Sequence, residues 1–281
     1  MNRVLFLLPF LLTGLAVSGQ YDYFTYENGR FQPDMHVYVF SDSCTLKTRP
    51  SVESNDIITL RQGDRLLVWN AEAAISERNG LIQYWYRVEY RTDSLATNGY
   101  ISGNDLALGA LNFQIDYRRD LLLFRITDYR EAGPYTLTAK IVRDGKTLKT
   151  VRTPFIDYHL NTANPDYSFS VLKNIQAGID EKSEVAEISY VHSQPEFPVG
   201  TLYLIWNGEN LAVICETTYF IDPELIEFES YLIYPGREGV QPGTVKKVEI
   251  LREFDEKSEG FLETERIETI FVWDGVSVRK K

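Results

Sequence analysis

Residues 57–69, IITLRQGDRLLVW, decide the fold expected for this chain. Two short apolar runs flank the dipeptide Gly63-Asp64. Glycine adopts a positive φ without steric cost, so a Gly-Asp pair between apolar runs is typical of a tight turn. The stretch therefore predicts a β-hairpin.

Strand signals continue on both sides of this stretch. Upstream, Val37 and Val39 alternate with other residues, and residues 44–51, CTLKTRPS, run into Pro50. Proline lacks the N–H that a strand ladder needs, so a strand should end there. Downstream, residues 85–90, WYRVEY, and 98–102, NGYIS, are rich in aromatic and β-branched residues. Residues 35–108 are thus expected to form one small β module.

The order of these motifs resembles the bacterial SH3 (SH3b) family. The family pattern is an "NLRxxPS"-like strand end, a turn at "L-x-x-G-D", then "W-Y-x-V" and "G-Y-I". Pro50-Ser51, Trp85 and Tyr100 match it, whereas Thr45 and Lys47 stand where the family has Asn and Arg. The resemblance implies an SH3-like barrel over residues 35–108 that binds cell-wall peptide or glycan, or a peptide of another envelope protein.

The resemblance also implies a ligand site. In such barrels a ligand lies in a shallow groove with aromatic walls. Tyr38 or Phe40 would form one wall and Tyr86 or Tyr100 the other, while an inserted loop at residues 71–83 forms a rim. Trp69 and Trp85 are expected to pack in the core. Because successive residues of a strand face opposite sides, Trp85 and Tyr86 cannot both face the ligand. We expect Tyr86 and Tyr100 to contact it.

The rest of the chain also reads as β structure. Residues 112–117, 121–127 and 135–142 are strand-like, and no window shows a helical period. Three similar segments carry Asp144-Gly145, Asn207-Gly208 and Asp274-Gly275, each a signal for a type I′ hairpin turn. We therefore expect an all-β protein in which a larger β-rich domain over residues 109–281 follows the small barrel. The aromatic-rich leader, residues 20–34, fits either a small hairpin or a segment packed on a domain.

The first 19 residues predict export. Arg3 precedes an apolar run, and residues 16–19, AVSG, are small enough for a cleavage site, so the mature chain should begin at Gln20. The run is too short for a comfortable membrane span, and no later stretch could serve as one. The expected location is the periplasm or the exterior.

Charge bears on the choice of partner. The formal net charge of −11 argues against nucleic acid. Residues 178–281 carry 21 acidic and 10 basic residues, so most of the excess lies in the C-terminal part. Within it, residues 180–188, DEKSEVAEI, resemble a calcium loop but lack its glycine. We expect an acidic loop leading into a strand, with no metal.

The sequence contains no catalytic or cofactor motif. His36, His159 and His192 do not lie at metal-ligand spacing from each other or from cysteine. Cys44 and Cys215 sit in apolar strand contexts and are expected to be buried; an oxidising compartment would also permit a bond between them. Cys215 paired with His159 or His192 is the alternative nucleophile.

These observations favour an exported, non-enzymatic binding protein of the bacterial envelope, without a cofactor. Two alternatives stay open. One is a cell-wall hydrolase whose active site lies in the C-terminal domain. The other is an acidic scaffold or inhibitor that holds a basic envelope protein. The sequence does not determine the oligomeric state.

Overall fold

The chain is described here from a computed structural model. It describes residues 30–128, 135–155, 167–174, 178–192, 199–222, 225–255 and 257–281. Within these ranges the only helix is one 3-10 turn, η1 (Gly103–Asp105), and all other regular elements are strands. The predicted all-β fold is confirmed. No helix in the described ranges has the length and apolar character needed to cross a membrane.

Six strands form a curled N-terminal sheet, here called the barrel, in the order β1-β4-β5-β6-β2-β3. The β1–β4 pairing continues into the turn before β4, where the N–H of Val39 donates to Asp64 O at 2.9 Å and the N–H of Gly63 donates to Val39 O at 2.9 Å. The strands are β1 (His36–Tyr38), β2 (Ser43–Lys47), β3 (Asp56–Arg61), β4 (Arg65–Arg78), β5 (Leu81–Arg91) and β6 (Ala96–Ser102).

The hairpin predicted at Gly63-Asp64 is wrong. Gly63 does adopt a positive φ of 81° and turns the chain. However, β3 pairs with β2, whereas β4 pairs with β1 and β5. The turn therefore connects two strands that are not neighbours in the sheet. A local signal can place a turn, but the partners of its flanking strands depend on distant segments.

The loop expected at residues 71–83 is also wrong, because most of it is strand. β4 and β5 extend to Arg78 and from Leu81, and the turn Asn79-Gly80 has positive φ at both positions, as type I′ turns require. The amide of Asn79 donates to Thr127 O at 3.2 Å on β8 (Arg118–Asp128). This hairpin arm contacts the following sheet.

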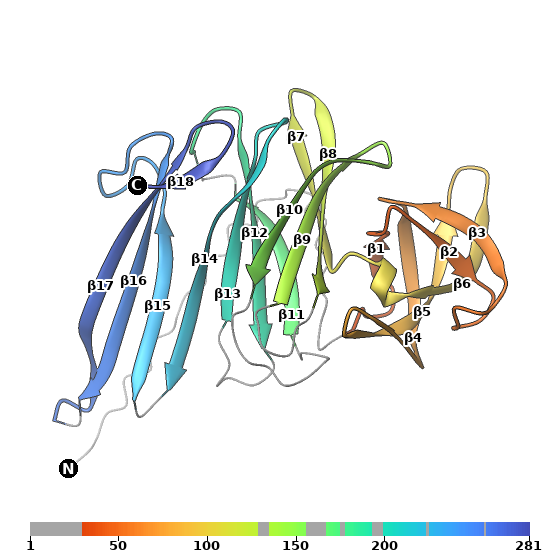
Figure 1. Cartoon of the computed structure of the whole chain (residues 1–281), viewed down its shortest axis with the longest axis horizontal. Helices are drawn as coiled ribbons and strands as arrows, with labels where there is room; N and C mark the ends of the chain where they lie inside the picture. The colour runs from red at the N-terminus through yellow and green to blue at the C-terminus, as the bar shows by residue number, and fades with distance from the viewer. Residues whose placement is uncertain are drawn as a thin grey trace, which may run out of the picture.

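Two further antiparallel sheets follow (Figure 1). The four-stranded sheet is ordered β10-β9-β8-β7 and packs over strands β11–β14 of the eight-stranded sheet. Buried residues such as Phe124, Leu137, Ile188 and Trp206 fill the space between them. The strands are β7 (Gly109–Ile115), β8, β9 (Tyr135–Arg143), β10 (Lys146–Phe155), β11 (Tyr167–Asn174), β12 (Glu184–His192), β13 (Val199–Trp206) and β14 (Leu211–Asp222).

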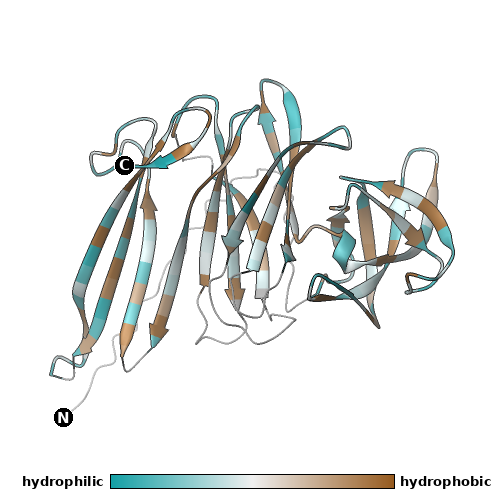
Figure 2. Cartoon of the chain, viewed as in Figure 1, coloured by the Kyte–Doolittle hydropathy of each residue, from teal (hydrophilic) through white to brown (hydrophobic). Residues whose placement is uncertain are grey.

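The eight-stranded sheet continues beyond this sandwich. Strands β15–β17 stand apart from the four-stranded sheet, and β18 covers only one end of β17 (Figure 1). Brown and teal alternate along β15–β17 in Figure 2, as expected when each strand turns an apolar and a polar face. The strands are β15 (Ile226–Ile233), β16 (Thr244–Asp255), β17 (Gly260–Trp273) and β18 (Val278–Lys280).

The part of the leader that the structure describes packs on the barrel. Phe31 is buried, and its ring meets that of Tyr86 edge to face with centroids 5.2 Å apart. Residues 20–29, including the Asn28-Gly29 turn signal, lie outside the described ranges.

The three repeated Asp/Asn-Gly segments all form hairpin turns, but of two kinds. Asp144 and Gly145 both have positive φ, which confirms a type I′ pattern. At the other two turns only the glycines, Gly208 (φ 92°) and Gly275 (φ 87°), are positive. There the glycine is the first central residue, as in a type II′ turn. Asn207 Oδ1 accepts from the N–H of residues 209 and 210 and so replaces part of the turn's backbone bonding.

Valine at Gly208 or Gly275 should lower the free energy of unfolding by about 1–3 kcal/mol, because a β-branched residue is strained at positive φ. A side chain at Gly275 meets no atom within 4 Å, so its whole effect comes from the backbone. Gly260→Val is the control, since a Cβ at Gly260 makes only an ordinary contact, at 3.9 Å, and Gly260 has no positive φ. Urea unfolding measures the three variants; equal midpoints would contradict the turn assignment.

Candidate functional site

The structure places Tyr38 and Phe40 between the barrel and the four-stranded sheet. Both are buried in one cluster with residues of the following segment: Ala107, Ala110, Leu123 and Val142. The Lys140 ammonium lies 4.6 Å from the centroid of the Phe40 ring, at a distance suited to a cation–π contact. The chain's own second sheet therefore covers the groove wall expected at Tyr38 and Phe40.

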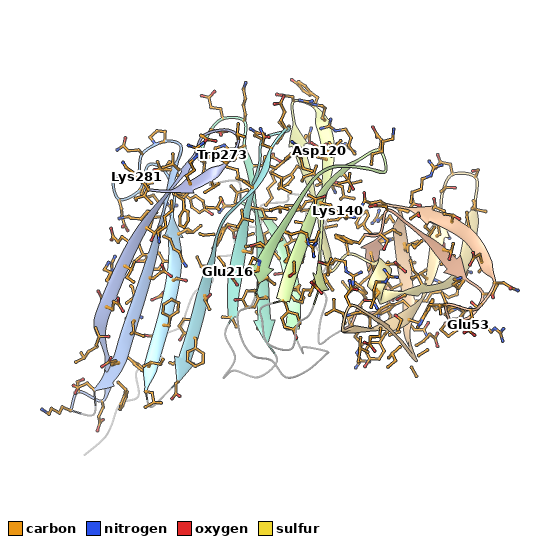
Figure 3. The ribbon with its side chains drawn as sticks, in the orientation of Figure 1. Glu53, Asp120, Lys140, Glu216, Trp273 and Lys281 are labelled. Carbon is orange, nitrogen blue, oxygen red and sulfur yellow. The ribbon has the colours of Figure 1, made fainter. Side chains whose placement is uncertain are left out.

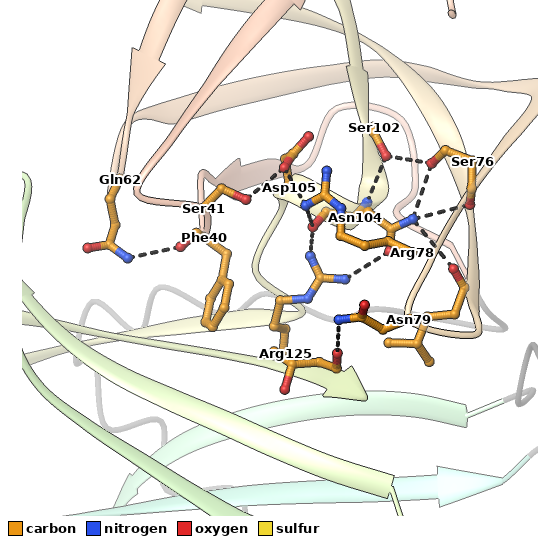
Figure 4. A network of polar contacts seen from close by, with 12 residues as sticks. Phe40, Ser41, Gln62, Ser76, Arg78, Asn79, Ser102, Asn104, Asp105 and Arg125 are labelled. Atoms are coloured by element: carbon orange, nitrogen blue, oxygen red, sulfur yellow. Dashed lines mark hydrogen bonds and ion pairs between the residues drawn. The ribbon is translucent and has the colours of Figure 1, made fainter. Parts of the chain in front are cut away.

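A polar network fixes this junction (Figure 4). The buried guanidinium of Arg125, on β8, donates to the backbone oxygen and to Oδ1 of Asn104 in η1. Arg78 of the hairpin arm donates to Asp105 Oδ1 at 2.8 Å, and Ser41 Oγ donates to the same oxygen at 2.7 Å. Four segments that are distant in the sequence are held together here.

A hollow of about 220 Å³ opens beside the network, with Arg78, Arg125 and Lys140 among its lining residues. Its cations already bind protein oxygens. Lys140 Nζ lies 2.9 Å from Asp42 Oδ1, and Arg78 is paired with Asp105. We interpret the hollow as part of the junction.

Tyr86 lies inside the barrel, with 0% of its surface exposed. Its hydroxyl accepts a hydrogen bond from the N–H of Phe31 at 3.2 Å. Burial raises the pKa of this phenol far above its usual value. The ring belongs to the buried core of the barrel, so the structure does not bring Tyr86 to a binding surface. Trp85 is buried as expected.

The expectation that Trp69 packs in the core is wrong, because its side chain lies on the surface. The indole is 36% exposed, while its neighbour Val68 points inward. A β-bulge between Val68 and Asn70 interrupts the pairing with β5 at this point, and bulges commonly redirect a side chain. The guanidinium carbon of Arg87 lies 4.7 Å from the centroid of the Trp69 ring.

Trp69 begins a row of side chains on the outer face of the barrel. Arg87 pairs directly with Tyr100, and Tyr100 pairs with Lys47, so these three residues share one face across β5, β6 and β2. Lys47 is held by Asp56 at 2.5 Å, and this hydrogen bond lowers the pKa of the Asp56 carboxyl. Tyr100 is half-buried. We call Trp69, Arg87, Tyr100 and Lys47 the outer strip.

Tyr100 is the only one of the four predicted contacts that belongs to the outer strip. Sequence reasoning missed Trp69 and Arg87 as surface partners. The available signal was the alternation of Leu66 and Val68 with Trp69, which places the indole opposite the two core residues.

The acidic loop at residues 180–184 uses its carboxylates to bind protein donors. Asp180 accepts from the N–H of Ser183 at 2.6 Å and from Trp273 Nε1 at 2.7 Å. Glu184 binds Lys173, and Glu187 accepts from the amide of Asn174. In the described part of the chain, no three His, Cys, Asp or Glu residues are arranged to hold a metal ion.

The two cysteines are free and partly buried. Burial raises the pKa of the Cys44 thiol to about 12 and that of Cys215 to about 12. A thiol with such a pKa is protonated near neutrality and is a poor nucleophile. His159 and the side chain of His192, its expected partners, lie outside the described residues.

No family model, curated protein or solved structure matches this chain.

Proposed function

We propose that this chain is an exported, non-enzymatic binding protein of the bacterial envelope and that the outer strip holds its ligand. The observation that supports the proposal is the exposed Trp69 indole, stacked by Arg87 in the same row as Tyr100. An exposed tryptophan beside an arginine combines the two residue types that most often carry binding energy.

The dimensions and chemistry of the strip suit a short polymer segment. Four neighbouring strands spaced by about 4.8 Å give a row about 14 Å long, which matches a few residues of an extended peptide or two to three sugar rings. The aromatic rings offer flat apolar surfaces to such a ligand. The guanidinium of Arg87 offers donors in a planar fork that fits a carboxylate.

The proposed ligand class is a cell-wall peptide or glycan fragment, or a peptide of another envelope protein. The resemblance of residues 35–108 to SH3b domains and the signal-like residues 1–19 support it. These features also support a periplasmic or secreted location. The raised thiol pKa values of Cys44 and Cys215 favour binding over a cysteine hydrolase.

Trp69→Ala and Tyr100→Ala should each weaken capture on isolated cell-wall sacculi by about tenfold or more, the loss typical of a central aromatic contact. The experiment compares pelleting of each protein over a range of sacculus concentrations. Ile75→Ala is the control, because Ile75 is a 58% exposed apolar residue on the same strand but outside the strip.

Thermal melting of every variant separates contact from stability. Lost capture with an unchanged melting temperature supports the strip. Unchanged capture by both aromatic variants contradicts it. If the parent protein does not sediment with sacculi but enriches one envelope protein in a pulldown, the ligand is a peptide of that protein.

A further inference from the structure

A cleft of about 330 Å³ opens where the barrel meets the outer face of the four-stranded sheet. One wall is the turn before β4, with Arg61, Gly63 and Asp64. The other wall carries Arg119 on β8 and Asp144 in the turn between β9 and β10, which reaches toward the barrel (Figure 1). A volume of this size lies at the lower end of the range for small-molecule sites, so the cleft suits a small ligand.

Direct contacts fix the distance between the two walls. Thr147 Oγ1 donates to Gln62 Oε1 at 2.5 Å, and Gln62 Nε2 donates to Phe40 O at 2.9 Å. The backbone of Gly63 lies against the sheet, since a Cβ there would be 3.5 Å from Val142 Cγ1. The walls are therefore in place before a ligand arrives, which lowers the entropic cost of binding.

Three guanidinium groups line the cleft, and two of them are available to a ligand. Arg143 is bound by Asp120 at 2.6 Å. Arg61 and Arg119 are exposed, and neither guanidinium forms an ion pair or hydrogen bond within the part of the chain that the structure describes. A guanidinium offers N–H donors in a planar fork that fits a carboxylate. The cleft thus holds two free groups of this kind, one on each wall.

Two carboxylates line the same cleft, and one of them is already bound. Asp64 Oδ2 accepts from the N–H of Arg61 at 2.7 Å. Burial and, after it, the Asp64 carboxylate raise the pKa of the Tyr90 phenol, which places Asp64 against the barrel. Asp144 is exposed and has no ion-pair partner among the described residues. The groups open to a ligand are therefore two guanidiniums and one carboxylate, and the cleft presents both signs of charge.

The sheet wall also supplies an apolar floor. Leu121 and Val142 pair across β8 and β9, and both line the cleft. Arg119 lies two positions before Leu121, so it shares the same face of the sheet. An inorganic anion would leave this floor uncovered. A ligand with a short carbon chain and charged ends fits the floor and the polar groups together.

We propose that this cleft binds a small zwitterion, namely a free amino acid or a short unblocked peptide. Its carboxylate binds Arg61 and Arg119, its ammonium group pairs with Asp144, and its carbon chain covers Leu121. None of the four residues of the outer strip lines the cleft. The inference therefore does not depend on the proposed function, and the two sites can be tested separately.

Calorimetric titration of the protein with the dipeptide alanylalanine tests the ligand class. The free dipeptide should bind at least about tenfold more tightly than its C-terminally amidated form and than its N-acetylated form, because each block removes one of the two charges. If the amidated form binds as tightly as the free one, the arginines do not hold a carboxylate and the proposal fails. Full affinity of the N-acetylated form would assign the cleft to simple carboxylates and overturn the zwitterion.

Variants locate the two ends of the ligand. Arg61→Ala and Arg119→Ala should each weaken the free dipeptide about tenfold and leave the amidated form unchanged. Asp144→Asn should weaken the free dipeptide but not the N-acetylated form, and asparagine tolerates the positive φ of 50° at this turn position.

Two exposed arginines outside the cleft serve as controls, Arg49 on the barrel and Arg152 on β10. Alanine at either position should leave the affinity unchanged. Equal losses in Arg119→Ala and Arg152→Ala, or no binding of the free dipeptide by the parent protein, would overturn the proposal. The blocked dipeptides are measured on the parent protein, so the outcome does not depend on the folding of any variant.

Discussion

Replacing Asp120 by alanine is expected to lower the free energy of unfolding by about 3 kcal/mol, the largest effect of any side-chain deletion proposed for this chain. The residue is 1% exposed and lies within the sandwich (Figure 3). Its carboxylate accepts two hydrogen bonds from Arg143, at 2.6 and 2.9 Å, and one from Trp206 Nε1 at 3.0 Å. Alanine would leave the buried indole N–H without its acceptor and would remove the partner of the guanidinium.

The position of Asp120 explains why the loss is large. Asp120 and Arg143 belong to the four-stranded sheet, whereas Trp206 lies on β13 of the other sheet. The carboxylate thus links the two layers of the sandwich. The hydrogen bond with Asp120 raises the pKa of Arg143, which keeps the bidentate pair charged. Because the Arg143 side chain is partly exposed, water recovers some of the lost interaction, which places the effect below that of a fully buried pair.

Urea unfolding of Asp120→Ala, Asp120→Asn and Asp42→Ala provides the measurement. Asparagine retains an acceptor for Trp206 and should cost less than alanine. Asp42 pairs with Lys140 from a side chain that is 85% exposed, so its removal should cost less than about 1 kcal/mol. Similar losses for Asp120→Ala and Asp42→Ala would contradict the linking role.

Gly109→Ala should also destabilise the fold, by about 1–3 kcal/mol, because the core next to it has no space for a methyl group. Gly109 pairs with Phe124 across β7 and β8, and a Cβ at Gly109 would lie 2.3 Å from Phe124 Cε1. The Phe124 ring is buried and packs edge to face with Phe169, at 6.5 Å between centroids. It can move aside only by disturbing both sheets.

The matched control for this prediction is Gly260→Ala. Gly260 also lies in a strand, and the nearest atom to its added Cβ is 3.9 Å away. Alanine there should be neutral or slightly stabilising, since it restricts the unfolded chain. If both alanine variants unfold at the same urea concentration, the tight contact at Gly109 does not constrain the core.

Local signals explain why the strands and turns were largely predictable. Alternation of apolar and polar residues and the presence of Asp-Gly or Asn-Gly depend on neighbours in the sequence. Asp144-Gly145 therefore formed its predicted type I′ pattern, and Cys44 and Cys215 lie partly buried in strands as expected. The turn at Gly63 was also placed correctly, although its strands pair elsewhere.

The candidate site was less predictable, because exposure depends on which segments pack together. Tyr38, Phe40 and Trp69 are all aromatic residues of the same module. The second sheet covers the first two, whereas the third lies on the opposite side of its strand from the core residues Leu66 and Val68 and is exposed. No local pattern within residues 35–108 indicates that residues 107–142 will pack against them.

The sequence by itself determined the all-β class, the positions of many of the strands and turns, and the acidic excess of residues 178–281. These properties follow from backbone conformational preferences, side-chain periodicity and charge, all of which act locally or add over the chain. Only the tertiary structure decided that β3 and β4 do not pair with each other, that Trp69 and Tyr100 share the outer face of the barrel, and that β18 covers only one end of β17. Each of these depends on contacts between distant segments, whose free energy is set by the burial of surfaces that meet only in the folded chain.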